Sequence, residues 1–157
     1  MQLAKAMQFM RENSLIHQDL KPENILLKKE NNGEYAVRLA DFGSILSCDY
    51  ENPVKGQPFG SFYYTAPEKL LSKEFSANSD LFSAGCILYF MVAGHALYSE
   101  VKEWDTDSYI EKVKEANINI PNNNLSPSFW NILYRLLQPQ STERLSFPDF
   151  FDHSFIS

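Results

Sequence analysis

Residues 81–93 are the sequence feature that most constrains the fold. They are apolar on nearly every face of a helix, and they are followed by Gly94, a residue that commonly ends helices. Such a helix must be surrounded by other elements, because any exposed face would place apolar side chains in water. We expect Asn78, Ser79 and Asp80 to cap its start. With 157 residues, the chain is long enough for one domain built around this helix.

Apolar residues three and four positions apart predict further helices, and two short apolar runs around an Asn-Gly turn predict a β-hairpin. The predicted helices cover residues 3–10, residues 65–71, residues 109–116 with a cap near Thr106, a segment that starts at Ser126, and a last turn after Ser146. The predicted hairpin strands cover residues 25–27 and 36–39, and the aperiodic residues 44–64 predict a long loop. We therefore expect an α+β fold that is predominantly α-helical.

Charge and composition argue against several classes of partner. The net charge of −6 argues against a nucleic-acid binder, which needs a basic face to offset phosphate repulsion. The longest uncharged apolar run, residues 84–94, is far shorter than the roughly 20 residues of a membrane span. Cys86 lies in an apolar run and Cys48 in a polar loop. Two cysteines placed in this way indicate neither a disulfide framework nor a metal site. We expect a cytoplasmic protein without nucleic-acid or membrane partners.

The polar loop of residues 17–24, His-Gln-Asp-Leu-Lys-Pro-Glu-Asn, carries the groups that phosphoryl transfer requires. Asp19 could accept the proton of a substrate hydroxyl and direct its oxygen, and Lys21 could neutralise a transferring phosphoryl group. Asn24 offers an oxygen ligand for Mg²⁺, and Asp41 could hold the same ion. Taken singly, Asp19 or Asn24 could equally be a turn residue and Lys21 a solvated loop lysine.

The order of three motifs favours the catalytic interpretation. The loop 17–24 is followed by Asp-Phe-Gly at 41–43 and Ala-Pro-Glu at 66–68, an order typical of protein kinases. Over essentially its whole length, residues 1–157, the chain resembles the C-terminal lobe of a eukaryotic protein kinase. Its catalytic loop would be 17–24, its activation segment 41–68 and its helical remainder 69–157. Residues 21–24, Lys-Pro-Glu-Asn, resemble the form found in serine/threonine kinases.

The resemblance implies ATP and Mg²⁺ as cofactors, a protein substrate, and roles for further residues. Catalysis would fall to Asp19 and Lys21, and Asn24 and Asp41 would bind the metal. Leu26 would line the floor of the adenine pocket, and His17 and Phe42 would belong to the stack that aligns the two lobes. Asp80 would anchor the catalytic loop. Ser61 would contact Asp19 and Lys21, and Glu68 would form an ion pair with Arg144.

One departure from the family lies at Gln18. Most kinases carry there an arginine that binds a phosphate on the activation segment, and a neutral glutamine cannot form this charge-assisted pair. Gln57, near the usual phosphate acceptor, cannot be phosphorylated. We expect the ordering of this site not to depend on phosphorylation there.

A second departure is the absence of a glycine-rich loop, of a V-A-I-K-type strand and of a helix with the partnering glutamate. We therefore expect the N-terminal lobe to be missing from this chain and to belong to a longer one. The favoured function is ATP- and Mg²⁺-dependent phosphorylation of serine or threonine in proteins, as a fragment of a full kinase. The alternative is a catalytically incompetent truncated kinase that acts as a protein-binding module. A small-molecule kinase is disfavoured by the Ala-Pro-Glu motif and by Arg144.

Overall fold

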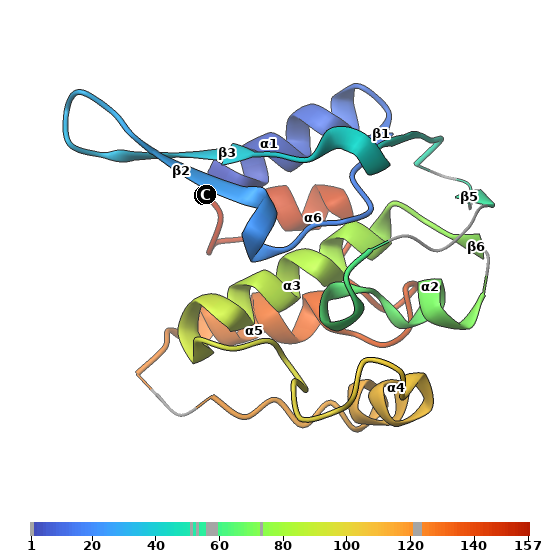
Figure 1. Ribbon diagram of the computed structural model, residues 1–157. Helices are drawn as coiled ribbons and strands as arrows, with labels where there is room; N and C mark the ends of the chain where they lie inside the picture. The colour runs from blue at the N-terminus through green and yellow to red at the C-terminus, as the bar shows by residue number, and fades with distance from the viewer. Residues whose placement is uncertain (1, 51, 53, 56–59, 73, 121–123) are drawn as a thin grey trace.

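The computed structural model describes residues 2–50, 52, 54–55, 60–72, 74–120 and 124–157 (Figure 1). The helices are α1 (Gln2–Glu12), α2 (Pro67–Leu71), α3 (Asn78–Ala93), α4 (Thr106–Glu115), α5 (Pro127–Leu136) and α6 (Phe147–Phe151). The strands are β1 (Leu15–Ile16), β2 (Ile25–Lys29), β3 (Tyr35–Leu39), β4 (Leu46–Ser47), β5 (Val54–Lys55) and β6 (Glu74–Phe75). The described residues form helices and small two-stranded sheets, as expected for an α+β fold, and more of them lie in helices than in strands.

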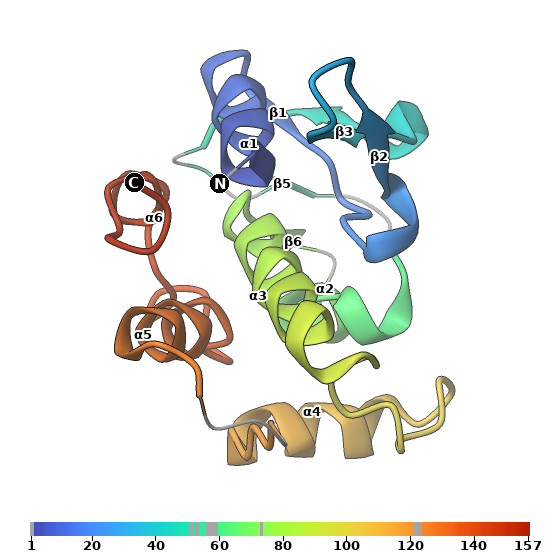
Figure 2. The same ribbon diagram turned by 90° about the vertical axis from the view of Figure 1, so that its left-hand side faces the viewer.

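Helix α3 runs through the centre of the molecule, with α1 and the β2–β3 hairpin at one end and α4 at the other (Figure 2). Residues 79–89 of α3 are all buried, and Gly94 ends the helix in the left-handed conformation with φ 77°, as its sequence predicts. The predicted cap is wrong, because the helix already begins at Asn78 and no side chain caps it. Asp80 therefore lies inside the first turn, and its carboxylate is available to another segment.

Gly85 allows α3 to pack closely against α5. A Cβ atom at this position would lie 2.9 Å from both the Cβ of Leu136 and the Cδ2 of Leu137. Figures 1 and 2 both show the two helices side by side. The absence of a side chain at residue 85 therefore sets the distance between them.

We expect Gly85→Ala to destabilise the protein. Overpacking costs about 1–3 kcal/mol, which exceeds the roughly 1 kcal/mol that alanine gains in helix propensity. Thermal unfolding followed by circular dichroism should show a lower midpoint than that of the wild type. Gly43→Ala is the matched control, because its new methyl group would meet Asp41 Oδ1 at 3.4 Å, an ordinary contact distance. An unchanged or higher midpoint for Gly85→Ala would contradict this packing argument.

The β2–β3 hairpin forms where the sequence predicts it. The strands pair antiparallel in the register Ile25↔Leu39 to Lys29↔Tyr35. Gly33 adopts φ 85° in the turn, a conformation that glycine reaches without steric cost. This hairpin ends beside Asp41, so its register sets the position of the Asp-Phe-Gly motif.

The prediction of an unstructured loop over residues 44–64 is wrong in part. Strand β4 pairs with β1, and β5 pairs with β6, each as an antiparallel ladder of two residue pairs. Strands of two residues are too short to show an alternation of apolar and polar side chains, so the sequence pattern does not predict them. They become visible only through their pairing with a distant strand. Gln57 lies outside the described residues, so its expected place near the phosphate-acceptor position is not described.

Side-chain caps fix the ends of the later helices. Ser126 accepts a hydrogen bond from the Phe129 N–H at the start of α5, and Ser146 accepts one from the Asp149 N–H at the start of α6. Both starts match the prediction. Helix α4 is capped by Asp105, which agrees with the cap predicted near Thr106.

Both cysteines are free and buried. The placement of Cys86 in the core is confirmed. Cys48 lies in a loop, as the sequence indicates, but it is buried and packs with the main hydrophobic cluster. In the part of the chain that the structure describes, no helix combines the length and hydrophobicity needed to cross a membrane.

Candidate active site

The polar loop 17–24 connects β1 to β2 and is anchored from the central helix. Asp80, which is buried in the first turn of α3, accepts the N–H of His17 at Oδ2 (2.7 Å) and the N–H of Gln18 at Oδ1 (3.1 Å). These bonds fix the N–H groups of the two residues that precede Asp19. The implied role of Asp80 as the anchor of this loop is confirmed.

Asp19 is buried and lies at the centre of a hydrogen-bonded cluster. Its Oδ1 accepts both the N–H of Ser61 (2.8 Å) and the Ser61 hydroxyl (3.0 Å), and its Oδ2 lies 3.0 Å from Lys21 Nζ. Burial by itself would raise the pKa of Asp19, but the hydrogen bonds from Lys21 and Ser61 and the charge of Lys21 outweigh it and lower this pKa. The carboxylate is therefore ionised and oriented at neutral pH.

Lys21 and Asn24 complete this cluster on the same loop. Lys21 Nζ donates to Ser61 Oγ (2.7 Å), so the implied contact of Ser61 with both Asp19 and Lys21 is confirmed. Asn24 is buried at the end of a short 3₁₀ turn (Pro22–Asn24), and its Nδ2 donates to the main-chain oxygen of Asp19 (2.9 Å). Since the amide nitrogen faces Asp19, the amide oxygen is the atom left for a cation.

Asp41 is brought to the same end of the hairpin by the pairing of β2 with β3. Ala40, next to it, donates its N–H to the Asn24 main-chain oxygen (2.9 Å), which extends the ladder by one step. Asp41 is exposed and adopts φ 60°, and its Oδ1 accepts the Gly43 N–H (3.4 Å). The hairpin thus carries the two residues predicted to bind Mg²⁺.

The donor types of Asn24 and Asp41 suit Mg²⁺, which takes oxygen ligands and usually binds one or two carboxylates together with water and substrate phosphates. Among the described residues, no group of three or more His, Cys, Asp and Glu side chains could hold a metal ion by itself.

Leu26 and Phe42 lie on the exposed side of this site. Leu26 is 53% exposed and Phe42 is 57% exposed. The ring of Phe42 lies 5.8 Å from that of His17 between centroids, as expected for the implied stack. Of the predicted site residues, Lys21 and Asn24 contact Asp19, whereas Asp41 and Leu26 are exposed.

Gln18 connects the catalytic loop to the segment after Asp-Phe-Gly. Its Nε2 donates to the main-chain oxygen of Ser44 (2.6 Å), and Ser44 Oγ in turn donates to the main-chain oxygen of His17 (2.7 Å). The glutamine therefore ties the loop 17–24 directly to the residue that follows the Asp-Phe-Gly motif. Ser44 was missed as a structural partner, because no local sequence pattern indicates this contact.

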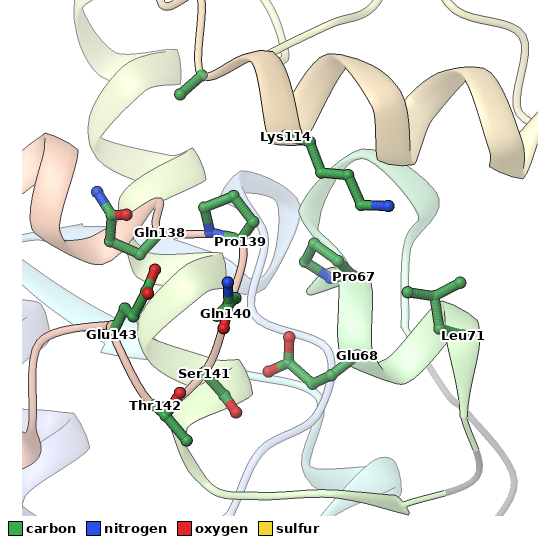
Figure 3. Close-up of a pocket in the computed structure, with 11 residues that line it drawn as sticks. Pro67, Glu68, Leu71, Lys114, Gln138, Pro139, Gln140, Ser141, Thr142 and Glu143 are labelled. Atoms are coloured by element: carbon green, nitrogen blue, oxygen red, sulfur yellow. The ribbon is translucent and has the colours of Figure 1, made fainter.

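Glu68 and Arg144 join the Ala-Pro-Glu motif to the C-terminal part of the chain. Arg144 Nη1 and Nη2 donate to Glu68 Oε1 (2.7 Å) and Oε2 (3.0 Å), and the arginine side chain is fully buried. The implied ion pair is confirmed. Glu68 also faces the segment 138–143 across a cavity of 610 Å³, toward which Lys114 extends from α4 (Figure 3).

Comparison with known proteins identifies the family. Residues 1–156 match the protein kinase domain family. The chain is 34% identical to the serine/threonine-protein kinase unc-51 of Caenorhabditis elegans over 162 aligned residues, which is 99% of this chain and 19% of that protein. It is 36% identical to the serine/threonine-protein kinase ULK3 of Xenopus laevis, covering 99% of this chain and 32% of that protein.

A human relative has similar coverage. The serine/threonine-protein kinase ULK1 of Homo sapiens is 33% identical over 99% of this chain and 15% of its own length. The chain therefore spans a third or less of the length of these three relatives. Both the family match and the relatives extend over nearly the whole chain, and the chain belongs to the protein kinase family, among the serine/threonine protein kinases.

Proposed function

We propose that residues 1–157 form the C-terminal lobe of a serine/threonine kinase that transfers the γ-phosphate of ATP to a protein hydroxyl. The observation that carries this proposal is the cluster around Asp19, in which a buried, ionised carboxylate is held by Ser61 and paired with Lys21. A carboxylate in this state can accept a hydrogen bond from a substrate hydroxyl and then its proton. Because the carboxylate is held in one direction, it can orient the substrate oxygen for in-line attack on the phosphorus.

In the proposed mechanism, each polar residue of the cluster has one task. Asp19 orients the substrate hydroxyl, and Lys21 stabilises negative charge on the transferring phosphoryl group. Asn24 and Asp41 would hold Mg²⁺, and the ion when bound would neutralise charge on the phosphates of ATP. Leu26 would contact the adenine base.

An exposed apolar surface at the same end supports the proposal that an N-terminal lobe completes the site. Large apolar side chains of α1, the hairpin and the Asp-Phe-Gly motif are each more than half exposed: Phe9, Leu26, Leu27, Tyr35 and Phe42. The pairing register places Leu27 and Tyr35 on one face of the hairpin and Leu26 on the other. A cavity of 390 Å³ between α1, β3 and Phe42 adjoins this surface, with an almost wholly apolar lining. Phe9 and Phe42 both line this cavity, and soluble proteins rarely leave large apolar patches uncovered. We propose that the N-terminal lobe packs on this surface.

The test compares the 157-residue chain with a longer form of the protein that contains a glycine-rich loop and its lysine. With Mg²⁺, radiolabelled ATP and a protein substrate, we expect the 157-residue chain to show little or no turnover and the longer form to be active. Efficient phosphorylation by the 157-residue chain would refute the need for an N-terminal lobe. An inactive longer form would refute the kinase function and favour a protein-binding module.

A further inference from the structure

Lys69 is a buried cation in the short helix α2. Only 2% of its surface is exposed, which is unusual for a lysine because an ammonium group loses its hydration on burial. Burial accordingly lowers the pKa of Lys69, although the nearby carboxylates of Asp80, Asp19 and Glu68 oppose this effect. A lysine at such a buried site needs a hydrogen-bond acceptor or an opposite charge close to its ammonium group.

One such partner is the peptide group directly before Asp19. Lys69 Nζ donates to the main-chain oxygen of Gln18 at 3.0 Å. The N–H of Gln18 donates to Asp80 Oδ1, so the residue is held on one side by a carboxylate of α3 and on the other by an ammonium of α2. Gln18 also adopts φ 71°, a left-handed conformation that a residue with a side chain adopts only when its surroundings impose it.

Gly60 makes room for this contact. A Cβ atom on Gly60 would lie 2.9 Å from the Gln18 main-chain oxygen and 3.7 Å from Lys69 Nζ. Gly60 directly precedes Ser61, whose N–H and hydroxyl both hold the Asp19 carboxylate. The ammonium of Lys69 therefore lies where the two segments that orient Asp19 meet.

We infer that Lys69 is a positioning residue for phosphoryl transfer, because its ammonium holds the Gln18 carbonyl and thereby fixes the direction of the Asp19 carboxylate. This inference rests on the proposed kinase function. The role is distinct from that of Lys21, whose ammonium contacts the carboxylate itself. Removing the ammonium should leave Asp19 ionised but less well directed.

The principal variant is Lys69→Met, which keeps the length and packing of the side chain but removes its donor and charge. In the active, longer form of the protein we expect kcat to fall by about 10- to 100-fold, because small misplacements of a directing group carry penalties of this size. The KM for ATP should change by less than about twofold, because Lys69 touches no proposed nucleotide ligand. Lys69→Arg, which keeps the charge and the donors, should retain more activity than Lys69→Met. Lys102→Met, at an exposed lysine, is the matched control and should match the wild type.

A second readout does not depend on activity. Nitrogen-15 NMR of lysine side chains in the 157-residue chain should show one slowly exchanging ammonium signal that Lys69→Met removes, together with shifts of the Gln18 and Asp19 amide signals. Wild-type kcat in Lys69→Met, or unshifted Gln18 and Asp19 amides, would overturn the inference. If the wild-type protein transfers no phosphate, the proposed function fails, and the NMR result alone decides whether Lys69 positions Asp19.

Discussion

Replacing Asp19 with asparagine is expected to lower kcat by about 100- to 10,000-fold, the usual contribution of a positioned acid–base group. Asparagine keeps the shape of the side chain, and its oxygen can still accept the Ser61 N–H that Asp19 accepts at 2.8 Å. It carries no charge, so it can neither accept the substrate proton nor pair with Lys21. Steady-state phosphorylation of a protein substrate, measured in the longer form proposed above, would give the loss.

The control for this variant is Asp107→Asn, an exposed carboxylate in the first turn of α4. Its kcat should equal that of the wild type. The thermal midpoint of Asp19→Asn should also be recorded, so that a loss of activity is not mistaken for a loss of fold. A folded Asp19→Asn protein with wild-type kcat would show that Asp19 is not the base.

Replacing Arg144 with methionine is expected to destabilise the fold by about 3–5 kcal/mol, the usual penalty for breaking a buried ion pair from one side. The guanidinium holds Glu68 at two atoms and also donates to the main-chain oxygens of Asn78 (2.8 Å) and Gln138 (3.0 Å). All of these acceptors lose their donor at once. For a domain of this size the thermal midpoint should fall by about 6–20 °C.

The matched control is Arg135→Met, since Arg135 forms a half-exposed pair with Asp149 at 3.9 Å. A surface pair of this kind contributes about 0–1 kcal/mol, so the midpoint should barely move. The double variant Glu68→Met with Arg144→Met should be more stable than the sum of the two single losses predicts, because no unpaired charge remains. Equal small effects of Arg144→Met and Arg135→Met would contradict the stabilising role of the buried pair.

The sequence alone determined the features whose causes are local. The hairpin could be predicted because Gly33 permits the left-handed turn between two apolar runs. The starts of α5 and α6 could be predicted because Ser126 and Ser146 cap residues only three positions away. The order of the catalytic motifs identified the family, and with it the pairing of Glu68 with Arg144.

Only the tertiary structure decided the features that depend on distant partners. The helix pattern predicted a cap at Asp80, and the resemblance to kinases implied that it anchors the loop 17–24. The structure shows the bonds that do this, from the Asp80 carboxylate to the N–H groups of His17 and Gln18, which lie 63 and 62 residues away. Nothing in the sequence separates Lys69 from a solvated lysine, because its burial and its bond to Gln18 arise only when α2 packs against the catalytic loop. Local pattern therefore specified which groups the site contains, and long-range packing specified how Asp19 is held among them.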